Sequence, residues 1–186
     1  MHKSIISVLS CSLVLSVALL SSCSDKLDDK KAVFSYVEDN IEGLTSFCES
    51  VENTSPYFES ITHTNNHAVS EADAAEIIDG MYAVGRINDS LFYEEVSYDF
   101  VEEPLAEGLI DSITMYVDYT LSYGFSCHSE DGKSIGFYYT ESDKPLFCGR
   151  EYDFDESEGG YKYALANGSE YYTERICENW FFYQMQ

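Results

Sequence analysis

The feature that most constrains the fold is a run of strict alternation over residues 112–125. Large apolar side chains fill the odd positions from Ile113 to Phe125, and mostly small or polar side chains fill the even positions. A period of two is typical of a β-strand with one buried face. A helix could be argued from Leu109 and Val117, but the longer alternation favours one strand over residues 112–125.

The surrounding segments predict an antiparallel meander. Asp131-Gly132 is a pair typical of a tight hairpin turn, and Asn167-Gly168 predicts a second one that sets Tyr163 opposite Tyr172. Residues 155–160 are expected to form an acidic loop. The six predicted strands are residues 91–101, 112–125, 134–139, 145–154, 161–166 and 170–183.

Two helices are predicted before this sheet. Apolar residues between Val33 and Val51 recur at spacings of three and four, which indicates a helix with one buried side. Ser70 and Asp73 resemble a capping box and begin a second predicted helix over residues 70–87. The predicted fold class is therefore α+β, with two N-terminal helices packed on an antiparallel meander sheet of about six strands.

The first 22 residues have the pattern of a secretory signal: Lys3, then an apolar run from Ile5 to Leu20 that is too short and too rich in serine to span a membrane comfortably. The sequence Leu20-Ser21-Ser22-Cys23 resembles the lipobox of bacterial lipoproteins. This resemblance implies cleavage before Cys23 and acylation of that residue, so that the acyl chains hold the protein at a membrane.

The resemblance divides the chain into three parts: a lipoprotein signal peptide over residues 1–22, a lipidated cysteine with a charged tether over residues 23–32, and a single acidic α+β domain over residues 33–186. Ser24 stands where that family's rule for retention in the inner membrane requires Asp. We therefore expect anchoring in the outer membrane of the cell envelope, with the domain facing the periplasm or the cell surface.

The charge of the processed chain restricts its partners. Removal of residues 1–22 takes away one base, Lys3, and no acid, so 34 acidic and 9 basic side chains remain, with a net charge of −25. This charge repels nucleic acid. It favours a cationic protein or a divalent cation, or it serves solubility alone.

Four cysteines belong to the predicted domain: Cys48, Cys127, Cys148 and Cys177. An even number in an oxidising compartment predicts two disulfides, and three pairings are open. We expect Cys127 to pair with Cys148 and Cys48 with Cys177. A metal site would show closely spaced pairs such as C-x-x-C, and the sequence has none.

Two segments carry residue types that bind metals. Asp153, Asp155 and Glu158 alternate in a way that resembles a calcium loop, but Glu158 stands where an EF-hand needs glycine. A calcium site of irregular geometry is the alternative to a solvated acidic loop. His63 and His67 have a zinc-like spacing without a third ligand, which favours solvated loop histidines. We expect no cofactor other than calcium.

No nucleophile elbow, phosphate loop or paired acid and base is present, so the sequence predicts a non-enzymatic protein. Its tyrosines exceed what one core face requires, and some are expected on an exposed face among acids. There they could bind Lys and Arg of a protein partner or stack on sugars. The candidates are Tyr116, Tyr138, Tyr152, Tyr171 and Tyr183.

Residues 125–139, FSCHSEDGKSIGFYY, resemble the strand and hairpin of periplasmic C-type lysozyme inhibitors, and Ser157, Gly160 and Tyr161 approximate the loop with which that family enters the lysozyme cleft. The resemblance implies a cationic partner and assigns no site residue here. The sequence therefore predicts an outer-membrane lipoprotein that binds a cationic protein, of inhibitor or immunity type. The alternative is an envelope component that binds calcium or glycan.

Overall fold

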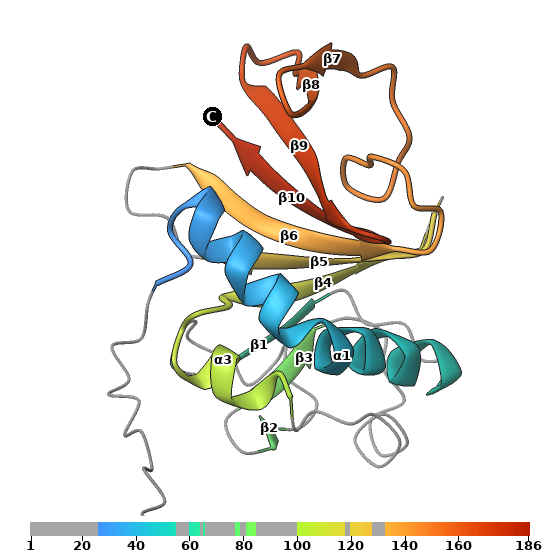
Figure 1. Cartoon of the computed structure of the whole chain (residues 1–186). Coiled ribbons are helices and arrows are strands. Elements are labelled where there is room, and N and C mark those ends of the chain that lie inside the picture. Colours follow the sequence, from blue (N-terminus) through green and yellow to red (C-terminus); the bar gives the residue numbers. More distant parts are fainter. Residues whose placement is uncertain are drawn as a thin grey trace, which may run out of the picture.

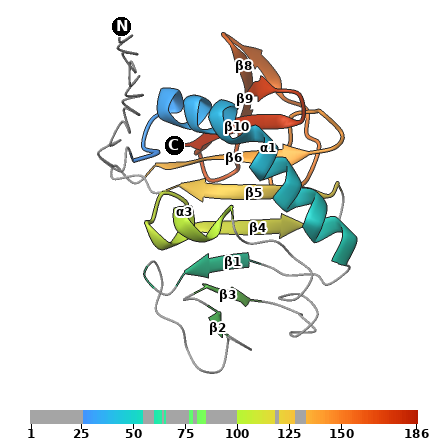
Figure 2. The same cartoon turned by 60° about the horizontal axis from the view of Figure 1, so that its bottom comes forward.

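The computed structural model describes residues 26–54, 60–63, 65, 77–78, 81–84, 100–117, 120–127 and 133–186. One long helix, α1 (Lys30–Thr54), lies across one face of an antiparallel sheet (Figures 1 and 2). Among the described residues, no helix combines the length and hydropathy needed to cross a membrane. The predicted signal, Cys23 and the start of the tether lie outside the described residues.

Local chemistry explains where α1 begins. The Asp29 carboxylate accepts a hydrogen bond from the Ala32 backbone nitrogen at 2.8 Å, which satisfies one of the free donors of the first turn. The apolar stripe predicted from the sequence is the buried side of the helix, with Val33, Leu44 and Val51 almost inaccessible to solvent. The predicted first helix is confirmed.

Within the described residues, the sheet has ten antiparallel strands in the order β2-β3-β1-β4-β5-β6-β10-β9-β8-β7, and its outermost strands are only two and three residues long. The strands are β1 (Ser60–His63), β2 (Ile77–Ile78), β3 (Met81–Val84), β4 (Ser112–Tyr116), β5 (Ser122–Cys127), β6 (Ser134–Thr140), β7 (Asp155–Ser157), β8 (Gly160–Ala164), β9 (Glu170–Cys177) and β10 (Trp180–Met185). The order departs from a meander because β1 lies between β3 and β4, and because β10 rather than β7 pairs with β6.

The main core lies between α1 and the face of the sheet toward it, which we call the first face. Phe125 and Phe137 stack there with ring centroids 4.7 Å apart, and Trp180 packs against both. The Trp180 indole nitrogen donates a hydrogen bond to the Thr45 hydroxyl of α1 at 3.2 Å. Aromatic burial of this kind contributes most to holding a helix on a sheet.

The predicted single strand over residues 112–125 is wrong, because the chain turns back in its middle. β4 and β5 form a hairpin that pairs Ile113 with Phe125 and Met115 with Tyr123. Odd residues therefore face odd residues, and the same face stays apolar on both strands. The alternation is preserved across the turn, so it could not distinguish one strand from two.

The predicted helix over residues 70–87 is wrong in the part that the structure describes. Ile78 pairs with Met81 in a β2–β3 hairpin, and β3 pairs in turn with β1. Between these two residues the sequence reads Asp79-Gly80, the same residue pair as at 131–132 and one that is typical of tight hairpin turns. Ser70 and Asp73 lie outside the described residues.

Of the strand predicted over residues 91–101, the structure describes only the last two residues. For these two the prediction is wrong. Phe100 and Val101 form a turn that leads into a short helix, α3 (Glu102–Ala106), in the stretch between the strands predicted at residues 91–101 and 112–125. The two acids Glu102 and Glu103 lie in its first turn, where they complement the helix dipole.

Three predictions for the C-terminal third are also corrected. Residues 145–154 form a loop with one isolated bridge between Phe147 and Arg150, and the predicted acidic loop at 155–160 holds β7 and the start of β8.

Tyr163 lies opposite Tyr171, not Tyr172, because the turn that closes the β8–β9 hairpin at Leu165 and Ser169 has three residues. The predicted strand over 170–183 is the β9–β10 hairpin. The β5–β6 hairpin is confirmed, although residues 128–132 lie outside the described part.

Candidate functional site

Four of the five predicted tyrosines line one cavity of about 240 Å³ on the face of the sheet opposite α1, the second face. They are Tyr116, Tyr138, Tyr171 and Tyr183. The sequence predicted them on an exposed face, and for two of them this is wrong, because Tyr138 is 5% exposed and Tyr171 4%. They are covered by residues 141–154, which we call the roof loop.

The fifth tyrosine, Tyr152, belongs to the roof loop itself. Its ring centroid lies 4.5 Å from that of Tyr163 on β8, and the ring centroid of Phe147 lies 4.7 Å from that of Tyr171 on β9. These contacts bury aromatic side chains of the loop against the second face. The roof loop is therefore packed against the sheet.

Two buried tyrosines hold the backbone of Leu146, at the centre of the roof loop. The Leu146 nitrogen donates to the Tyr138 hydroxyl at 2.9 Å, and the Tyr171 hydroxyl donates to the Leu146 carbonyl at 2.9 Å. Thr173 gives its own proton to the Phe182 carbonyl, so Tyr138 donates to Thr173 over their 3.0 Å contact. Each hydroxyl therefore fastens the loop through one hydrogen bond to the Leu146 backbone.

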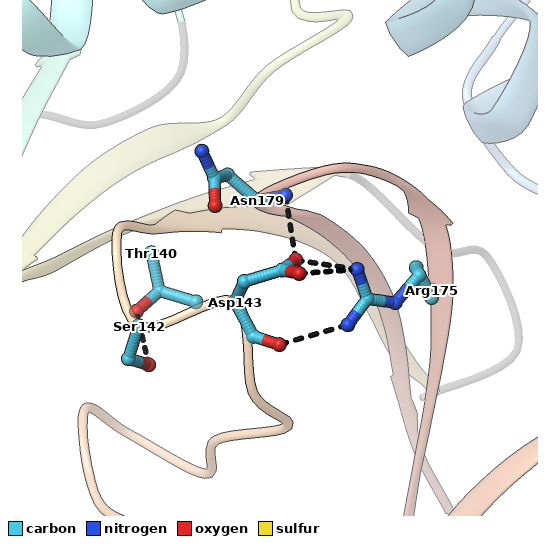
Figure 3. Close-up of polar contacts among 5 residues, drawn as sticks. All are labelled: Thr140, Ser142, Asp143, Arg175 and Asn179. Carbon is cyan, nitrogen blue, oxygen red and sulfur yellow. Dashed lines mark hydrogen bonds and ion pairs between the residues drawn. The ribbon is translucent and has the colours of Figure 1, made fainter.

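A charged clamp holds the start of the roof loop, at Asp143. Both Asp143 carboxylate oxygens contact Arg175 Nη1 of β9, at 2.5 and 2.6 Å, and the backbone nitrogen of Asn179 donates to the same carboxylate at 2.8 Å (Figure 3). The Arg175 Nη2 donates to the Asp143 carbonyl at 2.8 Å. Hydrogen bonding from Arg175 lowers the pKa of Asp143 below its ordinary value.

The rim of the cavity is a tight turn with two consecutive left-handed residues. Cys148 has φ 49° and Gly149 has φ 73°, and the flanking residues Phe147 and Arg150 exchange two backbone hydrogen bonds. Positive φ at both central residues is the geometry of a type I′ turn. The Gly149 carbonyl accepts from the Thr120 nitrogen at 3.1 Å, which fixes this turn against the β4–β5 hairpin.

Burial leaves the cavity electrically neutral. It raises the pKa of Tyr138 to about 12, and it raises the pKa values of Tyr116, Tyr171 and Tyr183 above their ordinary range. Burial also raises the pKa of the Cys148 thiol, against the lowering effect of a hydrogen bond that the Tyr116 hydroxyl donates to it. All five groups are therefore protonated near neutral pH.

Neither expected disulfide is formed, and the four cysteines are free thiols. Cys127 belongs to the main core on the first face, whereas Cys148 lies at the cavity on the second face, so the sheet separates them. Cys177 lies near Glu38 of α1, and Cys48 is ten residues further along that helix, about 15 Å at the rise of an α-helix.

The candidate metal ligands are not brought together. Asp153, Asp155 and Glu158 are exposed, and Asp155 lies opposite Lys162 in the β7–β8 pair. His63 is buried in β1, not solvated, and its Nδ1 accepts from the Asn65 nitrogen at 3.1 Å; His67 lies outside the described residues. Within the described part of the chain, no group of three His, Cys, Asp or Glu side chains has the geometry to hold a metal ion.

The exterior of α1 is acidic. Glu38, Asp39, Glu42 and Glu49 are exposed along it, and the helix has no Lys or Arg after Lys31. Three bases elsewhere are already engaged by acids: Lys144 with Glu151, Lys162 with Glu170, and Arg175 with Asp143. Lys30, at the start of α1, is paired with Glu174.

Sequence reasoning missed the small residues under the roof loop. Ser122, Gly124, Ser126 and Ser134 line the cavity on the second face. Their signal was present, because small residues at even positions alternate with the large residues of the first face. A strip of small side chains beside tyrosines is what a hollow on a sheet requires.

Comparison with family models, with curated proteins and with solved structures finds no match to this chain.

Proposed function

We propose that this chain is a lipid-anchored protein of the bacterial outer membrane that binds a cationic protein and catalyses no reaction. Acyl chains on Cys23 hold it at the membrane, and residues 24–32 separate the domain from the lipid surface. The domain faces the periplasm or the cell surface.

The observation that carries the proposal is the exposed side of α1. Glu38, Asp39, Glu42 and Glu49 present negative charge along a rigid helix without an interspersed base. Acids arranged in this way attract a basic protein during its approach and orient it on the surface. The net charge of the processed chain, −25, acts in the same direction.

The resemblance of residues 125–139 to lysozyme inhibitors selects the probe. We expect egg-white lysozyme, a basic protein, to bind the purified chain at about 20 mM salt and to bind at least tenfold more weakly at about 300 mM, where the Debye length is shorter. Isothermal titration at the two salt concentrations measures the difference.

A matched pair of variants distinguishes a surface from bulk charge. Substitution of Glu38, Asp39, Glu42 and Glu49 by their amides should weaken binding by about tenfold or more, since it removes the interface. The same substitutions at Asp153, Asp155, Glu156 and Glu158 remove equal charge elsewhere and should have a much smaller effect. Failure to bind basic proteins at low salt, or equal losses in both variants, contradicts the proposal.

A further inference from the structure

The geometry points to a binding site for a small, uncharged ring compound with at least one hydrogen-bonding oxygen, in the cavity between the roof loop and the second face. This inference is independent of the acidic surface of α1. It rests on the size of the cavity, the chemistry of its lining, and one buried hydroxyl that the protein leaves unused.

The size of the cavity suits a single substituted ring. Its volume is about 240 Å³, and a cavity of about 150 Å³ is enough to admit benzene. The rings of Tyr116, Tyr138, Tyr171 and Tyr183 surround it, and Gly124 lies among the residues of its wall. Aromatic faces on several sides favour a flat, largely apolar ligand.

The lining selects against charge. Among the described residues, no Asp, Glu, Lys, Arg or His lines the cavity. A charged ligand would therefore lose its hydration without gaining an opposite charge. The ligand is accordingly neutral.

Most hydroxyls of the described lining residues already have hydrogen-bond partners. The hydroxyls of Tyr138 and Tyr171 hold Leu146, Tyr116 is hydrogen-bonded to Cys148, and Tyr183 is hydrogen-bonded to Ser126 and Ser134. A sugar, with many hydroxyls, would find too few partners here.

Ser122 is a lining residue whose hydroxyl is left without a partner. Its side chain is 1% exposed, lines the cavity, and its Oγ has no hydrogen-bond partner among the described residues. Burial of a hydroxyl without a partner is costly, and native structures seldom tolerate it without a reason. A ligand oxygen that pairs with Ser122 supplies one.

Cys148 gives a direct test, because it is exposed at the rim while its turn lines the cavity. The full chain, purified in a non-aromatic detergent, is alkylated with N-ethylmaleimide with and without p-cresol at up to about 10 mM. Peptide mass spectrometry follows Cys148, and Cys177, on the first face, serves as an internal control. We expect p-cresol to slow alkylation of Cys148 at least threefold, with saturation, and to leave Cys177 unchanged.

Variants and analogues identify the interaction. S122A removes the hydroxyl without filling the cavity and should weaken protection by p-cresol about fivefold to tenfold, while the thermal stability of the unliganded chain stays equal or rises. 4-Methylbenzoate and glucose should not protect. Absence of saturable protection, equal protection of Cys177, equal protection by 4-methylbenzoate, or an unchanged affinity in S122A would overturn the inference.

Discussion

At the scale of the residue, the roof loop depends on Gly149. A Cβ atom added there would lie 2.5 Å from the Tyr116 Cβ, in a residue whose φ of 73° already disfavours side chains. Gly168 offers a matched control, because its φ is 89° and nothing lies within 4 Å of its Cβ position.

We therefore predict that substitution by alanine lowers the free energy of unfolding by different amounts at these two glycines. G168A should lower the free energy of unfolding by about 1 kcal/mol, the strain of a left-handed alanine. G149A should cost about 3 kcal/mol, since Tyr116 must also move. Urea denaturation of both variants measures the difference, and equal losses would show that the contact with Tyr116 is unimportant.

Tyrosine positions show what a sequence reveals at this scale. Even-numbered Tyr116 and Tyr138 belong to the second face, as their place opposite the apolar odd positions indicates. Their burial could not be predicted, because it depends on Leu146, which lies eight residues after Tyr138 in a loop with no periodicity. Periodicity reports the face of a strand, and not what covers that face.

At the scale of the element, the clamp between Asp143 and Arg175 joins the roof loop to β9. D143N preserves the shape of the side chain and suits the left-handed φ of 51°, but removes the charge. We predict a loss of about 1 kcal/mol at pH 7, a modest value because both side chains are partly exposed. D153N, in an exposed position of the same loop, should have no measurable effect.

The pH dependence has a definite sign. Arg175 lowers the pKa of Asp143 in the folded state, so the stabilisation is present above the ordinary value of 3.8 and is lost as the pH falls through the lowered pKa. The difference in unfolding free energy between the wild type and D143N should therefore shrink below about pH 4. A difference that grows on acidification would contradict this mechanism.

A second connection links the end of α1 to the residue after β6. Burial and the neighbouring Glu141 carboxyl raise the pKa of Glu52 to about 7, from an ordinary 4.5. The unfolded chain ionises first as the pH rises, so stability should fall between pH 4.5 and 7. Because Glu52 is only partly buried and solvent still screens its charge, we expect a fall of about 1 kcal/mol.

E52Q should abolish this part of the pH dependence and be more stable than the wild type above pH 7. E42Q, an exposed position on the same helix, is the control and should follow the wild-type curve. Thermal unfolding from pH 5 to pH 8 measures all three proteins, and parallel curves for E52Q and the wild type would exclude Glu52 as the source.

Elements were predicted best where one interpretation fitted the pattern. The stripe of α1 has no equivalent in a strand, and its helix is correct. The alternation over residues 112–125 fits one strand or a hairpin of even register equally well, and only the pairing of Ile113 with Phe125 decides. Ile77 to Val84 fits a helix by spacing, but strand partners in β1 outweigh this local preference.

At the scale of the whole molecule, the proposed lipid anchor at Cys23 would determine where the protein acts. We predict that cells supplied with an alkyne analogue of palmitate label the wild-type chain and the C11S variant, whereas C23S remains unlabelled, because the proposed attachment of acyl chains is at Cys23 alone. Gel fluorescence after coupling to a dye measures incorporation. Labelling of C23S would refute lipid attachment at this position.

The order of the strands could not be predicted from the sequence. Neighbouring strands in sequence usually pair, which favoured a simple meander. Instead β10 pairs with β6, and β7, β8 and β9 extend the sheet beyond β10. This order carries residues 141–154 across the second face and so creates the cavity, which is why neither the roof loop nor Ser122 could be predicted as a site.

The central place of β10 in the sheet also determines when the protein can fold during its synthesis. Residues 180–185 join β6 to β9 and supply Trp180 and Phe182 to the main core, so the two halves of the sheet cannot join until these residues have been synthesised. A chain synthesised only as far as residue 179 therefore cannot complete this fold. If the protein is exported through a translocation channel as an extended polypeptide, the delay is an advantage, since the fold would close only on the far side.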